Sequence, residues 1–166
     1  MATPYMHIDP PVIDGGGSVT AEGFVGWMEL TGLTATVERA IKQTAEFAKN
    51  REAAHPQIQA FGCTRQADRA TPKMFGWSVG GKPRKVTIKL CTPGAKGVPL
   101  PYCEYVMDNC VLSKFVLKDD ADGAPEEDFE VSFTKIDFKF QATDSKGGQQ
   151  LAGAATYDLV INKLIS

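Results

Sequence analysis

Residues 76–83, GWSVGGKP, have nearly the spacing of a loop that binds nucleotide phosphates. Such a loop has the form G-x-x-x-x-G-K followed by serine or threonine, whose hydroxyl binds Mg²⁺. Gly76, Gly81 and Lys82 satisfy this pattern, but Pro83 stands at the hydroxyl position. The order of elements is also reversed, because a helix is predicted before the segment and a strand after it. The sequence therefore favours a glycine-rich link between helix and strand over a nucleotide site.

The acidic segment DDADG, residues 119–123, resembles the start of a calcium-binding loop. The EF-hand loop needs acids at alternating positions, a glycine at position six and a glutamate at position twelve. Counted from Asp120, the acid Asp122 falls at position three, but Pro125 and Val131 occupy positions six and twelve. We interpret the segment as a solvated acidic loop.

Thiols and imidazoles are few and badly spaced for metal binding or nucleophilic catalysis. No two cysteines have a C-x-x-C spacing, and the only histidines, His7 and His55, have no partner at ligand spacing. A Cys–His or Ser–His–Asp set would have to use one of these two histidines. The four cysteines are predicted to be free thiols; they are Cys63, Cys91, Cys103 and Cys110.

Carboxylate chemistry is the one catalytic route that the sequence leaves open, because any two acids can meet in a fold. No acid lies in an obviously apolar pattern, however. We therefore predict no enzyme, no catalytic residue, no cofactor-binding residue, no cofactor and no metal ligand.

Length and charge narrow the class of protein further. The 166 residues suit a single domain spanning 1–166, and the net charge of −2 leaves no basic excess for binding nucleic acid. No apolar run approaches the ~20 residues of a membrane helix, so no membrane insertion is expected. The opening MATPYMHIDPP lacks both the charged and the apolar region of a signal peptide.

Alternating apolar residues predict a mainly β chain. A second strand is expected to begin at Phe24 and run to Thr34, and the last strand is expected to carry Tyr157, Leu159 and Ile161 on one face. The expected strands cover residues 5–9, 24–34, 58–63, 85–90, two adjacent segments within 102–117, 126–140 and 154–165.

Two helices are predicted between these strands. Residues 36–54 have Thr36 as a possible cap and a thin apolar stripe, which consists of Val37, Ile41, Ala45 and Ala48. A shorter helix is expected to begin with Thr71 as N-cap and Pro72 at the first helical position. Gly76, Gly80 and Gly81 keep that helix short.

The segment EEDFEVSFTKIDFKF, residues 126–140, is far longer than the mean strand of about 5–6 residues. Its apolar positions share one face up to Phe133 and again from Ile136, but the phase slips by one residue at Thr134–Lys135. A bulge there would bend one long strand. The bent strand is favoured over two strands with a sharp corner, because no Gly, Pro or Asn lies inside. Phe133 and Phe138 are both predicted to point inward.

The order of segments resembles the haemolysin-coregulated protein (Hcp) family over nearly the whole chain. DRATPKMF and DFEVSFTKIDFKF carry the resemblance most specifically, and their joint order with the other segments strengthens it. The segments are YMHID, GWMEL, ADRATPKMF, KVTIKL, EEDFEVSFTKIDFKFQ and a closing strand.

The resemblance implies a tail-tube-like fold, a small β-barrel of two antiparallel sheets with one short flanking α-helix. Proteins of this family form the inner tube of bacterial type VI secretion systems, in which hexameric rings stack into a hollow tube. The implied partners are further copies of the chain, the sheath, spike and baseplate proteins, and small effectors in the lumen. The tube would be cytoplasmic before firing and would then leave the cell or enter a target cell.

Two alternatives stay open: a tail-tube protein of phage-like origin, and a monomeric β-barrel that binds a small apolar ligand. One departure from the family also stands out. Relatives often have a glycine-rich extended loop where residues 36–54 look helical. Two oppositely charged segments would either orient stacked rings or be merely solvated: one contains Asp119, Asp120, Asp122, Glu126, Glu127 and Asp128, the other Lys82, Arg84 and Lys85.

Overall fold

The computed structural model of the chain describes residues 2–10, 12–15, 19–38, 57–94, 97–119, 123–143, 149–161 and 163–165. Within them lie strands and one helix, in the order β1 (Thr3–Asp9), β2 (Met28–Glu29), β3 (Gly32–Thr34), β4 (Val37–Glu38), β5 (Gln57–Ile58), β6 (Phe61–Gln66), α1 (Thr71–Gly80), β7 (Arg84–Pro93), β8 (Pro99–Lys118), β9 (Glu126–Ser132), β10 (Lys135–Thr143), β11 (Gln149–Asp158) and β12 (Lys163–Ile165). The expected mainly β chain with one short helix is confirmed.

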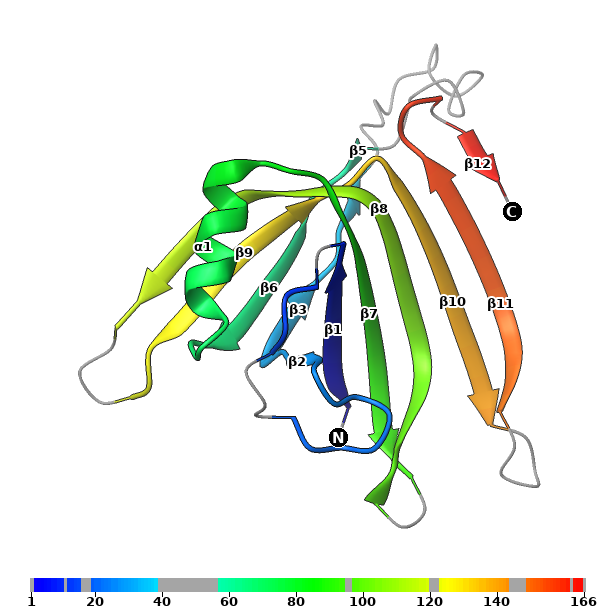
Figure 1. Cartoon of the computed structure of the whole chain (residues 1–166). Helices are drawn as coiled ribbons and strands as arrows, with labels where there is room; N and C mark the ends of the chain where they lie inside the picture. Colours follow the sequence, from blue (N-terminus) through cyan, green and yellow to red (C-terminus); the bar gives the residue numbers. More distant parts are fainter. Residues whose placement is uncertain are drawn as a thin grey trace.

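Strand β8 joins two antiparallel sheets that face each other (Figure 1). Its first part lies between β7 and β10, and this first sheet runs in the order β12-β11-β10-β8-β7-β1-β2. Its second part, from Val111 onward, pairs with β9, which continues to β6 and β3. The described pairs leave β2 and β12 at the ends of the first sheet and β3 at the end of the second.

The bend of β8 lies where it passes from one sheet to the other. Asn109 has a φ of 56° there, in the left-handed region that Asn tolerates better than most residues. The alternation at residues 102–117 predicts two adjacent strand segments, and the structure fuses them into one strand of 20 residues. The long bent strand of this fold is therefore β8.

The prediction of one bent strand at residues 126–140 is wrong. β9 ends at Ser132 and β10 begins at Lys135, with a corner between them and no bulge. The corner forms without Gly, Pro or Asn because tertiary hydrogen bonds hold it. The Thr134 N–H donates to the Asp108 carbonyl at 3.1 Å, and the Thr134 carbonyl accepts from the Leu159 N–H at 2.7 Å.

Three other expected elements are shorter than predicted. Residues 24–27 form a turn, in which the Trp27 N–H donates to the Phe24 carbonyl, so the second strand begins only at Met28. The helix predicted from Thr36 is wrong at its start, because Val37–Glu38 is strand β4, paired with β5; residues 39–54 lie outside the described part. The last strand breaks after Asp158, so Ile161 lies in an exposed turn.

The N-cap of helix α1 lies one residue before the predicted cap, Thr71. Ala70 is the N-cap, and the Asp68 carboxylate accepts a hydrogen bond from its N–H at 2.8 Å. The Thr71 hydroxyl instead accepts a hydrogen bond from the Asp68 N–H. At the other end, Gly81 adopts a left-handed φ of 66° and its N–H donates to the Trp77 carbonyl, a conformation that suits glycine.

The core joins both sheets to the inner face of α1. Met74 and Trp77 of the helix pack with the inward residues of β1, β6, β7, β8 and β9. The fully buried members include Met6, Ile8, Met28, Met74, Val86, Ile88, Met107, Cys110 and Val131. Among the described residues, no helix is long and apolar enough to cross a membrane.

The four cysteines are free, as predicted, and all four are buried. Burial raises the pKa of the Cys63 and Cys110 thiols from their ordinary 9.0 to about 12, so almost none of either is thiolate at neutral pH. We expect native protein to react with a thiol reagent at pH 8 far more slowly than protein unfolded in urea. Rapid labelling of all four thiols in the native state would contradict this.

Candidate functional site

The surface features of the protomer, rather than a cluster of reactive groups, form the candidate site. Within the described residues, no group of three His, Cys, Asp or Glu side chains is placed to hold a metal. His7 lies beside Trp27 and 3.9 Å from Asp9, while His55 lies outside the described part. Residues 76–83 span the end of α1 and the link to β7, as the sequence indicates.

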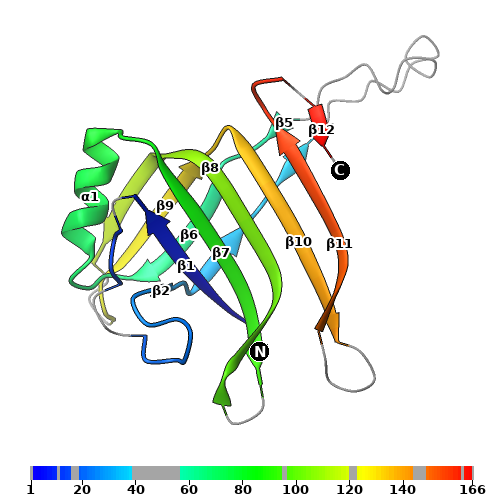
Figure 2. The ribbon, with the colours of Figure 1, turned by 45° about the vertical axis from the view of Figure 1, so that its right-hand side comes forward.

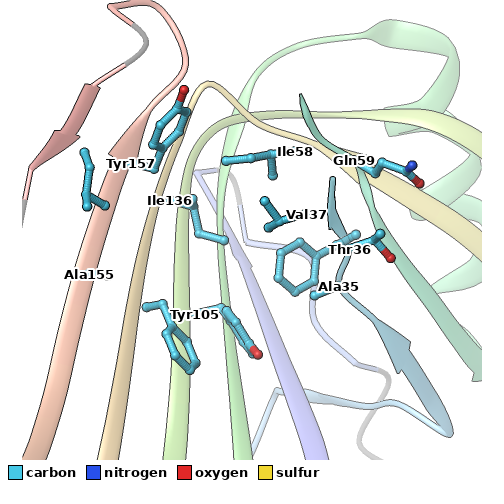
Figure 3. Close-up of a pocket in the computed structure, with 12 residues that line it drawn as sticks. Ala35, Thr36, Val37, Ile58, Gln59, Tyr105, Ile136, Ala155 and Tyr157 are labelled. Atoms are coloured by element: carbon cyan, nitrogen blue, oxygen red, sulfur yellow. The ribbon is translucent and has the colours of Figure 1, made fainter. Parts of the chain in front are cut away.

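An apolar groove of about 260 Å³ lies between the β4–β5 pair and the strands β8, β10 and β11 (Figure 3). Aromatic rings form its floor: Tyr105 stacks on Phe138 at 4.9 Å and meets Phe61 edge to face at 4.9 Å. Burial raises the pKa of Tyr105 to about 12, so its phenol is neutral. The lining residues are Ala35, Thr36, Val37, Ile58, Gln59, Phe61, Tyr105, Ile136, Phe138, Ala155, Tyr157 and Leu164.

Phe138 is predicted to point inward with Phe133, but it lies in this groove, where it is only half-buried. Phe133 is buried at 8% exposure, as predicted. The difference follows from the corner at Thr134, because β9 and β10 belong to different sheets. No local sequence signal reveals the groove, since β4 and β5 come from either side of residues 39–56.

Exposed apolar side chains gather at the C-terminal end and on the outer face of α1. Leu164 of the edge strand β12 is 60% exposed, and Val160 in the preceding turn is 75% exposed. Phe75 and Val79 lie one turn apart on α1, both more than half exposed. Large exposed apolar side chains at an edge strand and on a helix face indicate surfaces that other proteins or copies can cover.

The basic segment lies at the C-terminal end of α1. Arg84 opens β7, and its guanidinium carbon lies 5.4 Å from the centre of the Trp77 ring. Lys82 and Lys73 line a cavity of about 460 Å³ beside it. Lys85, the third residue of the predicted basic set, is exposed and does not line this cavity.

The acidic set that the sequence groups together divides into two kinds in the structure. Glu127 is buried against Arg65, and Asp128 pairs with Lys118 and Thr64, so these acids are not merely solvated. The hydrogen bonds that Lys118 and Thr64 donate to Asp128 hold the pKa of this carboxyl below its usual value. Asp119 and Glu126 are exposed, while Asp120 and Asp122 lie outside the described residues.

A family model for "Type VI secretion system effector, Hcp" matches residues 5–140. The chain belongs to the Hcp family. It is therefore a tube subunit of a type VI secretion system. Hcp proteins are structural tube proteins. The match stops at residue 140, so β11 and β12 lie beyond the matched region.

Solved structures show the same fold at low sequence identity. One, described as a type six secretion system protein, superposes with a TM-score of 0.85 at 16% identity and covers 99% of this chain and 100% of that one. Hcp1 from Salmonella typhimurium gives 0.73 at 20% identity, with 99% and 100% covered. Hcp3 from Pseudomonas aeruginosa gives 0.63 at 18%, with 95% and 98% covered. No curated protein matches the sequence.

Proposed function

We propose that six copies of this Hcp chain close into a ring and that the rings stack into the hollow inner tube of the apparatus. The match to the Hcp family over residues 5–140 carries the proposal. The exposed apolar side chains at β12, in the turn before it and on α1 support it, because β12 and α1 lie on opposite sides of the protomer (Figure 1). Each copy in a ring contacts its two neighbours through two different surfaces, as in any heterologous ring.

The proposed tube implies partner proteins and a route out of the cell. Sheath, spike and baseplate proteins would surround and cap it, and small effectors would travel in its lumen. The tube would assemble in the cytoplasm and leave the cell on firing. These roles come with the proposed assembly, and no described residue is assigned to any of them.

The mass of the purified protein in solution tests the ring. Native mass spectrometry should give a sixfold multiple of the 17.9 kDa protomer, and negative-stain images should show rings with a central hole. A monomer at micromolar concentrations would overturn the proposal. Such a monomer with an apolar molecule extracted from the groove at Tyr105 and Phe138 would favour the ligand-binding alternative.

The rings should not depend on disulfides. All four thiols are free and buried within the protomer, so none is available to link neighbouring copies. We expect the same ring mass with and without a reductant such as dithiothreitol. Rings that dissociate on reduction would show that a thiol opens to form a link between copies.

A further inference from the structure

Arg84 carries hydrogen-bond donors that the protomer leaves unused. Its Nε and Nη1 atoms are buried and have no partner among the described residues. A guanidinium has five N–H donors and keeps its charge in proteins. The Trp77 ring contacts the flat face of this guanidinium, and that contact favours the cation. The N–H groups lie in the plane of the guanidinium, so the ring accepts a hydrogen bond from none of them. The group is thus positioned and partly dehydrated without an acceptor.

The space beside Arg84 is open enough to admit an acceptor. One face of α1, from Lys73 through Gly76 to Gly80, forms part of the lining of the cavity of about 460 Å³, and Val12 and Ile13 also line it. A Cβ added at Gly76 or Gly80 would have no heavy atom within 4 Å, so this face of the helix leaves room. Lys73 and Lys82 add two positive charges, and no acidic residue is among the described residues that line the cavity. Its chemistry suits an anionic group.

The chain itself offers such a group at the other end of the second sheet. Figures 1 and 2 both place the β8–β9 hairpin and the link from α1 to β7 at opposite ends of that sheet. Asp119 and Glu126 flank the hairpin turn and are exposed, and neither forms an ion pair within the described part of the chain. Their carboxylates cannot reach Arg84 of the same copy.

We propose that the cavity at Arg84 binds a hairpin carboxylate, Asp119 or Glu126, of a neighbouring copy in the adjacent ring. The inference rests on the proposed tube and identifies the side chains that hold one ring on the next. Because the two surfaces differ and lie at opposite ends, the contact repeats from ring to ring in one direction. A carboxylate would supply the acceptor that the guanidinium lacks and offset the surplus positive charge.

Arg84→Gln tests the cavity, and Lys85→Gln is its matched control. Both variants lose one positive charge, one residue apart, but only Arg84 lines the cavity. Ring mass is measured by native mass spectrometry, and stacking is measured by sedimentation and negative-stain microscopy at 50 mM salt. We expect both variants to form rings, with the concentration needed for stacking raised at least about tenfold in Arg84→Gln, because hydrogen bonds to charged groups are the strong ones.

The acidic side is tested separately, since Asp119 and Glu126 are exposed and their replacement leaves the fold intact. Asp119→Asn with Glu126→Gln should lose stacking as Arg84→Gln does. Arg84→Glu combined with Asp119→Lys and Glu126→Lys should restore much of it. Stacking of the parent should weaken between 50 mM and 500 mM salt while its ring mass stays unchanged, because salt screens surface charges.

Three results would overturn the inference. Arg84→Gln rings that stack like the parent would show that the cavity is not used. Equal losses in Lys85→Gln would show that net charge alone matters. Stacking that persists in the Asp119→Asn, Glu126→Gln variant would show that the anion comes from elsewhere, such as free phosphate. A parent that forms no rings would instead overturn the proposed function itself.

Discussion

Replacing Arg65 with methionine should lower the free energy of unfolding by about 3–5 kcal/mol, because it leaves a buried carboxylate without its cation. Arg65 and Glu127 face each other across the β6–β9 pair, with side chains that are 2% and 0% exposed. Asp68 pairs with the same guanidinium at 2.5 Å but is partly open to solvent. That loss is a large part of the ~5–15 kcal/mol of a typical domain.

The order of three variants makes this prediction specific. Glu127→Gln should cost less than Arg65→Met, because Asp68 still compensates the guanidinium. Arg65→Met combined with Glu127→Leu should recover most of the loss, since both charges are then gone. Urea denaturation at one fixed protomer concentration measures all three, which keeps any contribution of assembly comparable. Full stability of Arg65→Met alone would show that water reaches Glu127 in solution.

The Arg65–Glu127 pair shows where inference from the sequence stops. The sequence groups Glu126, Glu127 and Asp128 with the acids of residues 119–122 in one charged segment, because six acids stand within ten residues. Their alternation with Phe129 places Glu127 on the buried face of β9, and only the pairing with β6 brings Arg65 opposite. The register between strands whose paired residues Arg65 and Glu127 lie 62 positions apart in the chain is a tertiary property that local composition does not encode.

Local signals succeeded where each element is determined by its own residues. The strand at residues 85–90 and the helix at Pro72 depend on alternation and on a proline in the first turn, and both are present. The corner at Thr134 was not predicted, because the hydrogen bonds that hold it are made with Asp108 and Leu159, which are distant in the sequence. The prediction of a helix from Thr36 is wrong at Val37, because that residue pairs with Ile58 of β5.

The surfaces of the candidate site also include features that the sequence predicts and features that it does not. Charge at Lys82 and Arg84 is visible in the sequence, so a basic end of the protomer could be predicted. The cavity that makes Arg84 different from Lys85 could not, because it depends on how α1 packs beside β7. The groove at Tyr105 could not be predicted either, since its lining comes from seven strands and from the links β3–β4 and β5–β6.

Phe133→Ala should destabilise the protomer by about 3–5 kcal/mol, the usual cost of removing a buried phenylalanine ring. Phe133 is 8% exposed and meets the fully buried Phe61 edge to face, with ring centres 5.9 Å apart. Its loss would leave a cavity at the corner where the chain passes from β9 to β10, and there the backbone cannot collapse without breaking the bonds of Thr134. We expect a lower urea midpoint or insoluble protein.

Phe138→Ala is the matched control, because it removes the same ring five residues along the chain. Phe138 is half-buried in the groove, where its main aromatic partner is Tyr105, so its loss should cost only about 1–2 kcal/mol in proportion to the smaller apolar area that it buries. Equal losses in the two variants would mean that the groove is closed in solution and that Phe138 belongs to the core. A Phe133→Ala protein as stable as the parent would instead place Phe133 at the surface and contradict the corner at Thr134.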